Sequence, residues 1–155
     1  MPVIKTDNFD GNLDYGEQFE LIYTIEALTA GNWVAFVSAN TANPAAAREF
    51  SIQTSINTDT DGPPNVCGIA VESPTAAGMT RIQVAGRYAT ANVATSVANG
   101  DALVASAVEG RAQDADQLAD GQDQMDYRHC GIVLDATDAA TNLSIVRIIR
   151  HPHFA

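Results

Sequence analysis

One short segment occurs twice in this chain of 155 residues. Residues 67–73 read CGIAVES and residues 130–136 read CGIVLDA, 63 positions further along. In each copy a cysteine and a glycine precede a short apolar run. Repeated segments indicate that one structural unit is used more than once. We therefore expect Ile69 and Ile132 to occupy equivalent environments in two copies of one unit.

The similarity extends beyond these segments in both directions. A gapless shift aligns residues 67–87 with residues 130–150, so that isoleucine, alanine and arginine positions coincide. Upstream, LTAGNWVAF at 28–36 resembles VANGDALVA at 97–105, and each combines a turn containing glycine with an apolar run. The period exceeds the 20–50 residues of common solenoid repeats, and there are only two copies. These matches predict an internal duplication.

The local pattern favours β-structure throughout. Residues 19–27, FELIYTIEA, alternate with a period of two, which indicates a strand whose apolar face is buried and whose acidic face is wet. Similar short runs follow, separated by Gly, Asn, Asp and Pro turn signals. We predict an all-β chain, a compact β-sandwich or barrel with a short helix at most. It would form one domain over 19–155, built from two similar modules at about 28–90 and 97–151.

The first 18 residues differ from the rest. They are polar with scattered large apolar residues, and we predict an extended N-terminal arm over 1–18. Phe9, Leu13 and Tyr15 are candidate contacts of this arm, and large aromatic side chains such as Phe9 and Tyr15 are enriched in interface cores. Trp33 is a further candidate contact, although its place at the start of an apolar run favours a position in the core.

Composition restricts the classes of partner. Lys and Arg number 8 against 19 Asp and Glu, which gives a formal net charge of −11. Phosphate backbones would be repelled, so nucleic-acid binding is not expected. No apolar run reaches the length of about 18 residues that a membrane helix needs, and residues 1–12 lack the pattern of a signal peptide. We expect no membrane association.

Few residues suggest chemistry. Cys67 and Cys130 fall on equivalent repeat positions, and buried free thiols are favoured over a disulfide or a metal or catalytic site. His129 precedes Cys130, but neighbours in a strand point to opposite faces. The polar insert at 110–126 predicts a loop with at most one helical turn, and its aspartates do not follow calcium-loop spacing. We predict no catalytic, cofactor-binding or metal-binding residues, and no enzyme activity.

The repeated pattern "ALTAGNWVAFV … CGIAVESPTAAGMTRIQVAGRYAT … VANGDALVAS … GRAQ … CGIVLDATDAATNLSIVRII" resembles the capsid decoration, or cement, proteins of tailed bacteriophages, over about residues 19–150. The resemblance implies a structural protein of the virion, made in the host cytoplasm. It would bind the exterior of the capsid as a homotrimer, with the major capsid protein as its partner. By bridging neighbouring capsid subunits it would stabilise the shell.

Two other classes of function remain open. A non-catalytic β-sandwich module that binds carbohydrate or protein would present a row of exposed aromatic side chains, whereas the chain has 5 Phe, 4 Tyr and 1 Trp, concentrated before residue 60. A small trimeric β-enzyme would need a polar pocket containing a carboxylate with a shifted pKa. No residue of the sequence is a candidate base for such a pocket.

Overall fold

The computed structural model describes residues 16–37, 51–54, 66–117 and 129–149. Within these ranges the chain is all-β, as predicted, and its helical elements are single turns of 3₁₀ helix. The strands are β1 (Gln18–Thr24), β2 (Trp33–Phe36), β3 (Ser51–Thr54), β4 (Val66–Ala70), β5 (Gly78–Asn92), β6 (Ala102–Ala105), β7 (Ala112–Asp114), β8 (Gly131–Asp135) and β9 (Leu143–Ile148). The 3₁₀ turns are η2 (Ala115–Gln117) and η4 (Ala139–Thr141).

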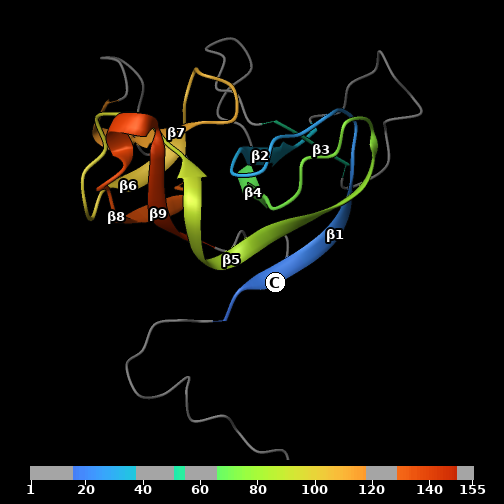
Figure 1. The fold of residues 1–155 in the computed structure, drawn as a ribbon, viewed down its shortest axis with the longest axis horizontal. Coiled ribbons are helices and arrows are strands. Elements are labelled where there is room, and N and C mark those ends of the chain that lie inside the picture. The colour runs from blue at the N-terminus through green and yellow to red at the C-terminus, as the bar shows by residue number, and fades with distance from the viewer. Residues whose placement is uncertain (1–15, 38–50, 55–65, 118–128, 150–155) are drawn as a thin grey trace, which may run out of the picture.

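The strand pairings form two rings that share β5. In the first ring the order is β1-β3-β2-β4-β5, and β5 pairs again with β1. In the second the order is β5-β9-β8-β6-β7, and a parallel bridge from Val93 to Ala112 joins β7 to the end of β5. Figure 1 shows the two groups of strands on either side of the view, with β5 running beneath both. Because both rings close, the fold leaves few sheet edges unpaired among the described strands.

The two rings have the same pattern of connections. The first ring closes through the parallel pair β1–β3, and the second through the parallel bridge at Val93, while the remaining pairs are antiparallel. Val34 pairs with Gly68 in the first ring, and Leu103 pairs with Gly131 in the second. These two pairs join residues that the predicted duplication aligns, and the duplication itself stays a prediction. The first ring also includes β1, which precedes the predicted module start at residue 28.

One backbone hydrogen bond recurs in the two rings. The amide of Gly31 donates to the carbonyl of Ala70 at 2.8 Å, and the amide of Gly100 donates to that of Val133 at 2.9 Å. Both glycines have positive φ, 91° and 92°, a conformation that residues with a Cβ rarely adopt. The turn before each apolar strand therefore needs glycine at the same place.

The gapless alignment is wrong by one residue in the last strand of each unit. Ala70 pairs with Ile82, whereas its counterpart Val133 pairs with Val146. Ile82 and Val146 are both fully buried, and Ile145 lies on the outer face. One additional residue stands between the paired strands of the second unit, where the connection contains the turn η4.

Each ring encloses a buried apolar cluster. The first consists of Ile22, Leu28, Val34, Ile52, Cys67, Ala70, Ile82 and Val84. At the matched positions the second cluster contains Ala91, Val97, Leu103, Ala112, Cys130, Val133, Val146 and Ile148. The smaller residues Ala91 and Ala112 replace Ile22 and Ile52, and the second cluster also contains side chains from the first ring: Trp33, Val66 and Ile69.

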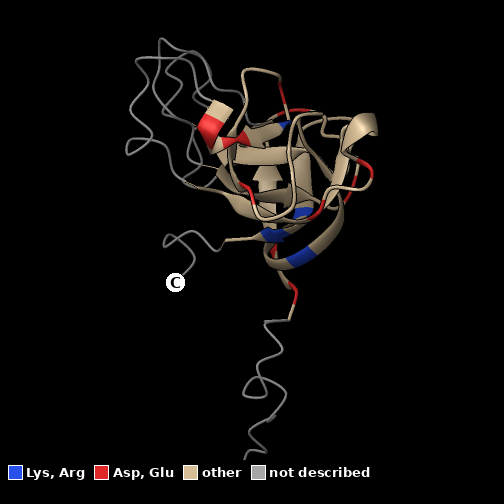
Figure 2. Ribbon diagram, turned by 90° about the vertical axis from the view of Figure 1, so that its left-hand side faces the viewer, with Lys and Arg blue, Asp and Glu red and all other residues tan. Residues whose placement is uncertain are grey.

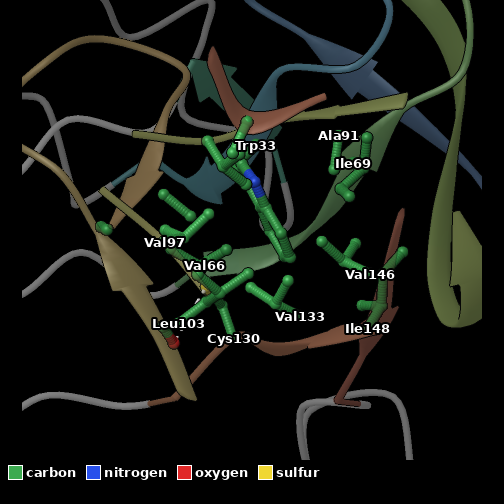
Figure 3. Packing of buried hydrophobic residues seen from close by; sticks show 14 residues of the cluster. Trp33, Val66, Ile69, Ala91, Val97, Leu103, Cys130, Val133, Val146 and Ile148 are labelled. Carbon is green, nitrogen blue, oxygen red and sulfur yellow. Dashed lines mark hydrogen bonds between the residues drawn. The ribbon is translucent and has the colours of Figure 1, made fainter. Parts of the chain in front are cut away.

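Trp33 is the largest of those side chains. It starts β2 and points away from the first ring into the second cluster, as Figure 3 shows. Its side chain is fully buried, and Nε1 donates a hydrogen bond to the carbonyl of Asn92 at 3.0 Å. The indole therefore links the two halves, because its strand β2 is part of the first ring and its side chain packs in the cluster of the second ring.

The interpretation of residues 110–126 as a loop is wrong in part. Ala112–Asp114 forms β7, which pairs with β6 and is followed by η2. A three-residue strand is too short to show a period of two, and pairing with β6 specifies its conformation instead. Residues 118–128 lie outside the described part of the chain.

Candidate functional site: two exposed faces

The outer face of β1 carries large apolar side chains in water. Phe19 and Leu21 are 41% and 68% exposed, and Met79 on the neighbouring β5 is 56% exposed. Leu21 lies directly opposite Arg81, and Tyr23 lies opposite Met79, so these side chains share one face of the strand pair. We call Phe19, Leu21 and Met79 the β1–β5 patch.

This face is the reverse of the one expected from the sequence. The period-two pattern of residues 19–27 predicts that Phe19 and Leu21 are buried, yet Ile22 and Thr24 point into the ring and are buried instead. Closure of the ring decides the orientation. The hydroxyl of Thr24 accepts a hydrogen bond from the amide of Glu26 and donates to the carbonyl oxygens of Glu26 and of Ile52 on β3. The more apolar side of β1 is thereby left in solvent.

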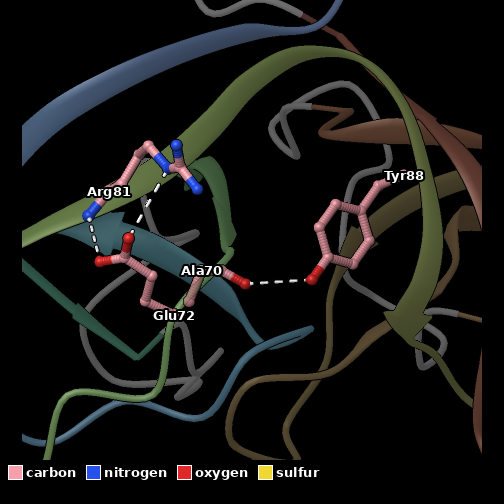
Figure 4. Close-up of polar contacts among 4 residues, drawn as sticks. All are labelled: Ala70, Glu72, Arg81 and Tyr88. Atoms are coloured by element: carbon pink, nitrogen blue, oxygen red, sulfur yellow. Dashed lines mark hydrogen bonds and ion pairs between the residues drawn. The ribbon is translucent and has the colours of Figure 1, made fainter.

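Arg81 makes polar contacts at the edge of the β1–β5 patch. The guanidinium of Arg81 lies 5.2 Å from the ring centroid of Phe19, within range of a cation–π contact. Its Nε is 3.7 Å from the Glu72 carboxylate, and its backbone amide donates to the same carboxylate at 3.4 Å (Figure 4). Both side chains are more than half exposed, so the ion pair orients Arg81 and contributes little stability.

Tyr88 connects the second half of β5 to the first ring. Its hydroxyl donates to the carbonyl of Ala70 at 3.3 Å (Figure 4). Partial burial raises the pKa of Tyr88 above its ordinary value, against the opposing effect of hydrogen bonds. The phenol remains neutral at physiological pH and acts as a structural donor between the two halves.

A second exposed face lies on the outside of β5, β9 and β8. Arg87 on β5 is directly opposite Arg147 on β9, and Arg147 is directly opposite Ile132 on β8. Ile132, Leu134 and Ile149 are 37%, 43% and 41% exposed around them. We call these five residues the arginine face. In Figure 2 most of the blue ribbon segments gather in the lower part of the described domain.

A carboxylate borders the arginine face. Two hydrogen bonds from Thr137, one from its hydroxyl and one from its amide, lower the pKa of Asp135, and the positive charge of Arg87 adds to this effect. Asp135 is therefore ionised at neutral pH. Its hydrogen bonds are to Thr137, and its negative charge offsets part of the charge of Arg87.

The reactive side chains are buried apart from one another. Cys67 and Cys130 are free thiols in separate clusters, and their Sγ atoms donate to the carbonyls of Val34 at 3.5 Å and Leu103 at 3.4 Å. Burial raises both thiol pKa values well above their usual range. His129 is exposed beside buried Cys130. Within the described ranges no group of three or more His, Cys, Asp or Glu residues is placed to hold a metal ion.

The candidate contacts named from the sequence have different outcomes. Trp33 is fully buried, in agreement with the core position that its sequence favours, and its side chain offers no surface for a partner in this chain. Phe9, Leu13 and Tyr15 lie outside the described residues, and their role stays a prediction. Sequence reasoning missed the β1–β5 patch because the composition of β1 predicts the opposite orientation. It missed the arginine face because that face is formed by pairing between distant segments.

Comparison of the chain with known family models, curated proteins and solved structures found no match. Among the described residues there is no helix with the length and apolar character needed to cross a membrane.

Proposed function

We propose that this chain is a structural protein of a phage virion that binds the outer surface of the capsid and stabilises the shell by bridging major capsid subunits, as a homotrimer. The observation that supports this proposal most is the reversed orientation of β1. An ordered strand presents Phe19 and Leu21 to solvent while Ile22 and Thr24 point into the ring. Exposed apolar patches on ordered strands mark contact surfaces.

The β1–β5 patch is suited to binding without rearrangement. β1 pairs with β3 on one edge and with β5 on the other, so partners meet its face rather than its edge. A rigid surface loses little conformational entropy on association. Complete burial of a leucine side chain such as Leu21 is worth about 1.5–3 kcal/mol. The predicted arm contacts Phe9, Leu13 and Tyr15 precede this strand and would extend the same contact surface.

Stabilisation of the shell follows from mass action. A protein that binds only the assembled shell lowers the free energy of that state relative to the disrupted one. Three linked copies bind more tightly than one, because the second and third contacts form at high effective concentration. The net charge of −11 favours a basic surface on the capsid partner.

The other classes of function receive less support from the described residues. A carbohydrate-binding face needs several exposed aromatic rings, and Phe19 is the one aromatic among the large exposed apolar residues of the described ranges. An enzyme needs a reactive group with access to substrate, and both thiols are buried and protonated. A structural protein that carries out no reaction accounts more simply for the few exposed aromatic rings and the buried thiols.

Co-sedimentation with empty, expanded shells of the cognate phage tests the proposal. Wild-type protein should pellet with the shells to saturation, and Leu21→Asp should lose most of this binding, because a carboxylate would be buried in an apolar contact. Val108→Asp is a matched control, since Val108 is 49% exposed between β6 and β7 and outside the patch. Absence of wild-type binding, or equal binding by Leu21→Asp, would contradict the proposal.

A further inference from the structure

We propose that the arginine face is the surface through which one copy of this chain binds a second copy. The inference deepens the proposed function, because it locates the subunit contact of the oligomer, and it rests on that oligomer being formed. It assigns separate roles to the two exposed faces: the arginine face to self-association and the β1–β5 patch to the shell.

The first line of evidence is the burial of the corresponding face in the first ring. Ile69 and Gln83 in the first ring correspond to Ile132 and Arg147 in the second, since each pair is matched across neighbouring strands. Ile69 and Gln83 are 0% and 2% exposed, and Ile69 packs in the cluster of the second ring. Ile132 is 37% exposed. The expectation of equivalent environments for Ile69 and Ile132 is therefore correct in strand register and wrong in burial.

This difference in burial indicates which kind of partner would cover the arginine face. Within the chain, the outer face of one unit is covered by another unit of the same topology. In the second unit the corresponding face is apolar but uncovered, with Leu134 and Ile149 exposed beside Ile132. A second copy of the chain provides units of this topology.

The second evidence is charge. Arg87 and Arg147 face each other across β5 and β9, and like charges at directly opposed positions destabilise a strand pair. A carboxylate from a partner between the two guanidinium groups would relieve the repulsion and accept charge-assisted hydrogen bonds from both. The chain has 19 Asp and Glu against 8 Lys and Arg, so a second copy offers carboxylates in excess of its basic groups.

The same charges restrict the symmetry of the contact. A twofold contact through this face would place Arg87 and Arg147 of one copy close to those of its partner. We therefore place the arginine face against a different, acidic surface of the second copy. Heterologous contacts of this kind generate a ring where the rotation closes, as in the proposed homotrimer.

Light scattering after size exclusion, with sedimentation equilibrium over a range of concentrations, tests the inference on the full chain. Wild-type protein should have the mass of three copies. Ile132→Asp and Arg147→Glu should each lower the measured mass to that of a monomer, with an increase of at least tenfold in the apparent dissociation constant of the oligomer. Leu21→Asp is the matched control with equal loss of an exposed apolar side chain, and it should remain an oligomer. Circular dichroism checks that each variant is folded.

Three results would overturn the inference. They are a monomeric wild-type protein, an oligomer that survives both Ile132→Asp and Arg147→Glu, and an oligomer that Leu21→Asp disrupts instead. Shell binding is measured separately by co-sedimentation. An intact oligomer that does not bind shells would reject the proposed function alone, and a trimer that binds shells but survives both Ile132→Asp and Arg147→Glu would reject the inference alone.

Discussion

Two glycines at matched positions give a quantitative test of the fold. A Cβ at Gly68 would lie 2.3 Å from the carbonyl oxygen of Gln83, and a Cβ at Gly131 would lie 2.8 Å from that of Arg147. Both obstacles include a backbone atom in a neighbouring strand, and at Gly131 the indole of buried Trp33 lies equally close, at 2.8 Å. A methyl group can therefore be accommodated only by separating paired strands, and at Gly131 also by displacing Trp33. Overpacking of this kind costs about 1–3 kcal/mol.

We expect Gly68→Ala to lower the free energy of unfolding by about 3 kcal/mol and Gly131→Ala to lower it by about 2 kcal/mol, since its backbone contact is less severe. Gly78→Ala is the control, because no atom lies within 4 Å of the added Cβ. In a strand this change should be neutral or stabilising by up to about 1 kcal/mol. Urea unfolding followed by circular dichroism gives all three values. If Gly68→Ala remained within about 0.5 kcal/mol of wild type, the described approach of β4 to β5 would be wrong.

Three further predictions follow from the same structure. Trp33→Ala should lower the free energy of unfolding by about 3–5 kcal/mol in urea, and a loss under about 1 kcal/mol would show that the indole does not join the two halves. Cys67 and Cys130 should not react with a thiol reagent at pH 8 until the chain unfolds, because burial raises their thiol pKa values; rapid reaction of native protein would contradict their placement. Deletion of residues 1–16 should reduce occupancy on shells in co-sedimentation, and unchanged occupancy would reject the arm as a contact.

The sequence predicts those features that depend on local pattern. Alternation and frequent turn residues predict an all-β chain, and the structure confirms it. Gly31 and Gly100 mark the two matched turns, since positive φ favours glycine wherever it occurs. The placement of Trp33 in the core follows from the apolar run that it opens.

The features that the sequence does not predict depend on distant contacts. β1 presents its more apolar side to water because Ile22 and Thr24 are the residues that complete the first ring. β7 is a strand because it pairs with β6, and its own residues are mostly polar. The opposition of Arg87 and Arg147 arises from pairing between segments 60 residues apart, which no local pattern reveals.

The most direct test of the account measures the shell itself. Expanded shells are heated with and without saturating protein, and the temperature of disruption is recorded. A brace that binds the assembled state should raise this temperature, and Leu21→Asp at the same concentration should leave it unchanged. If wild-type protein saturates the shells and the disruption temperature does not rise, the chain binds the capsid without bracing it and the central claim is wrong.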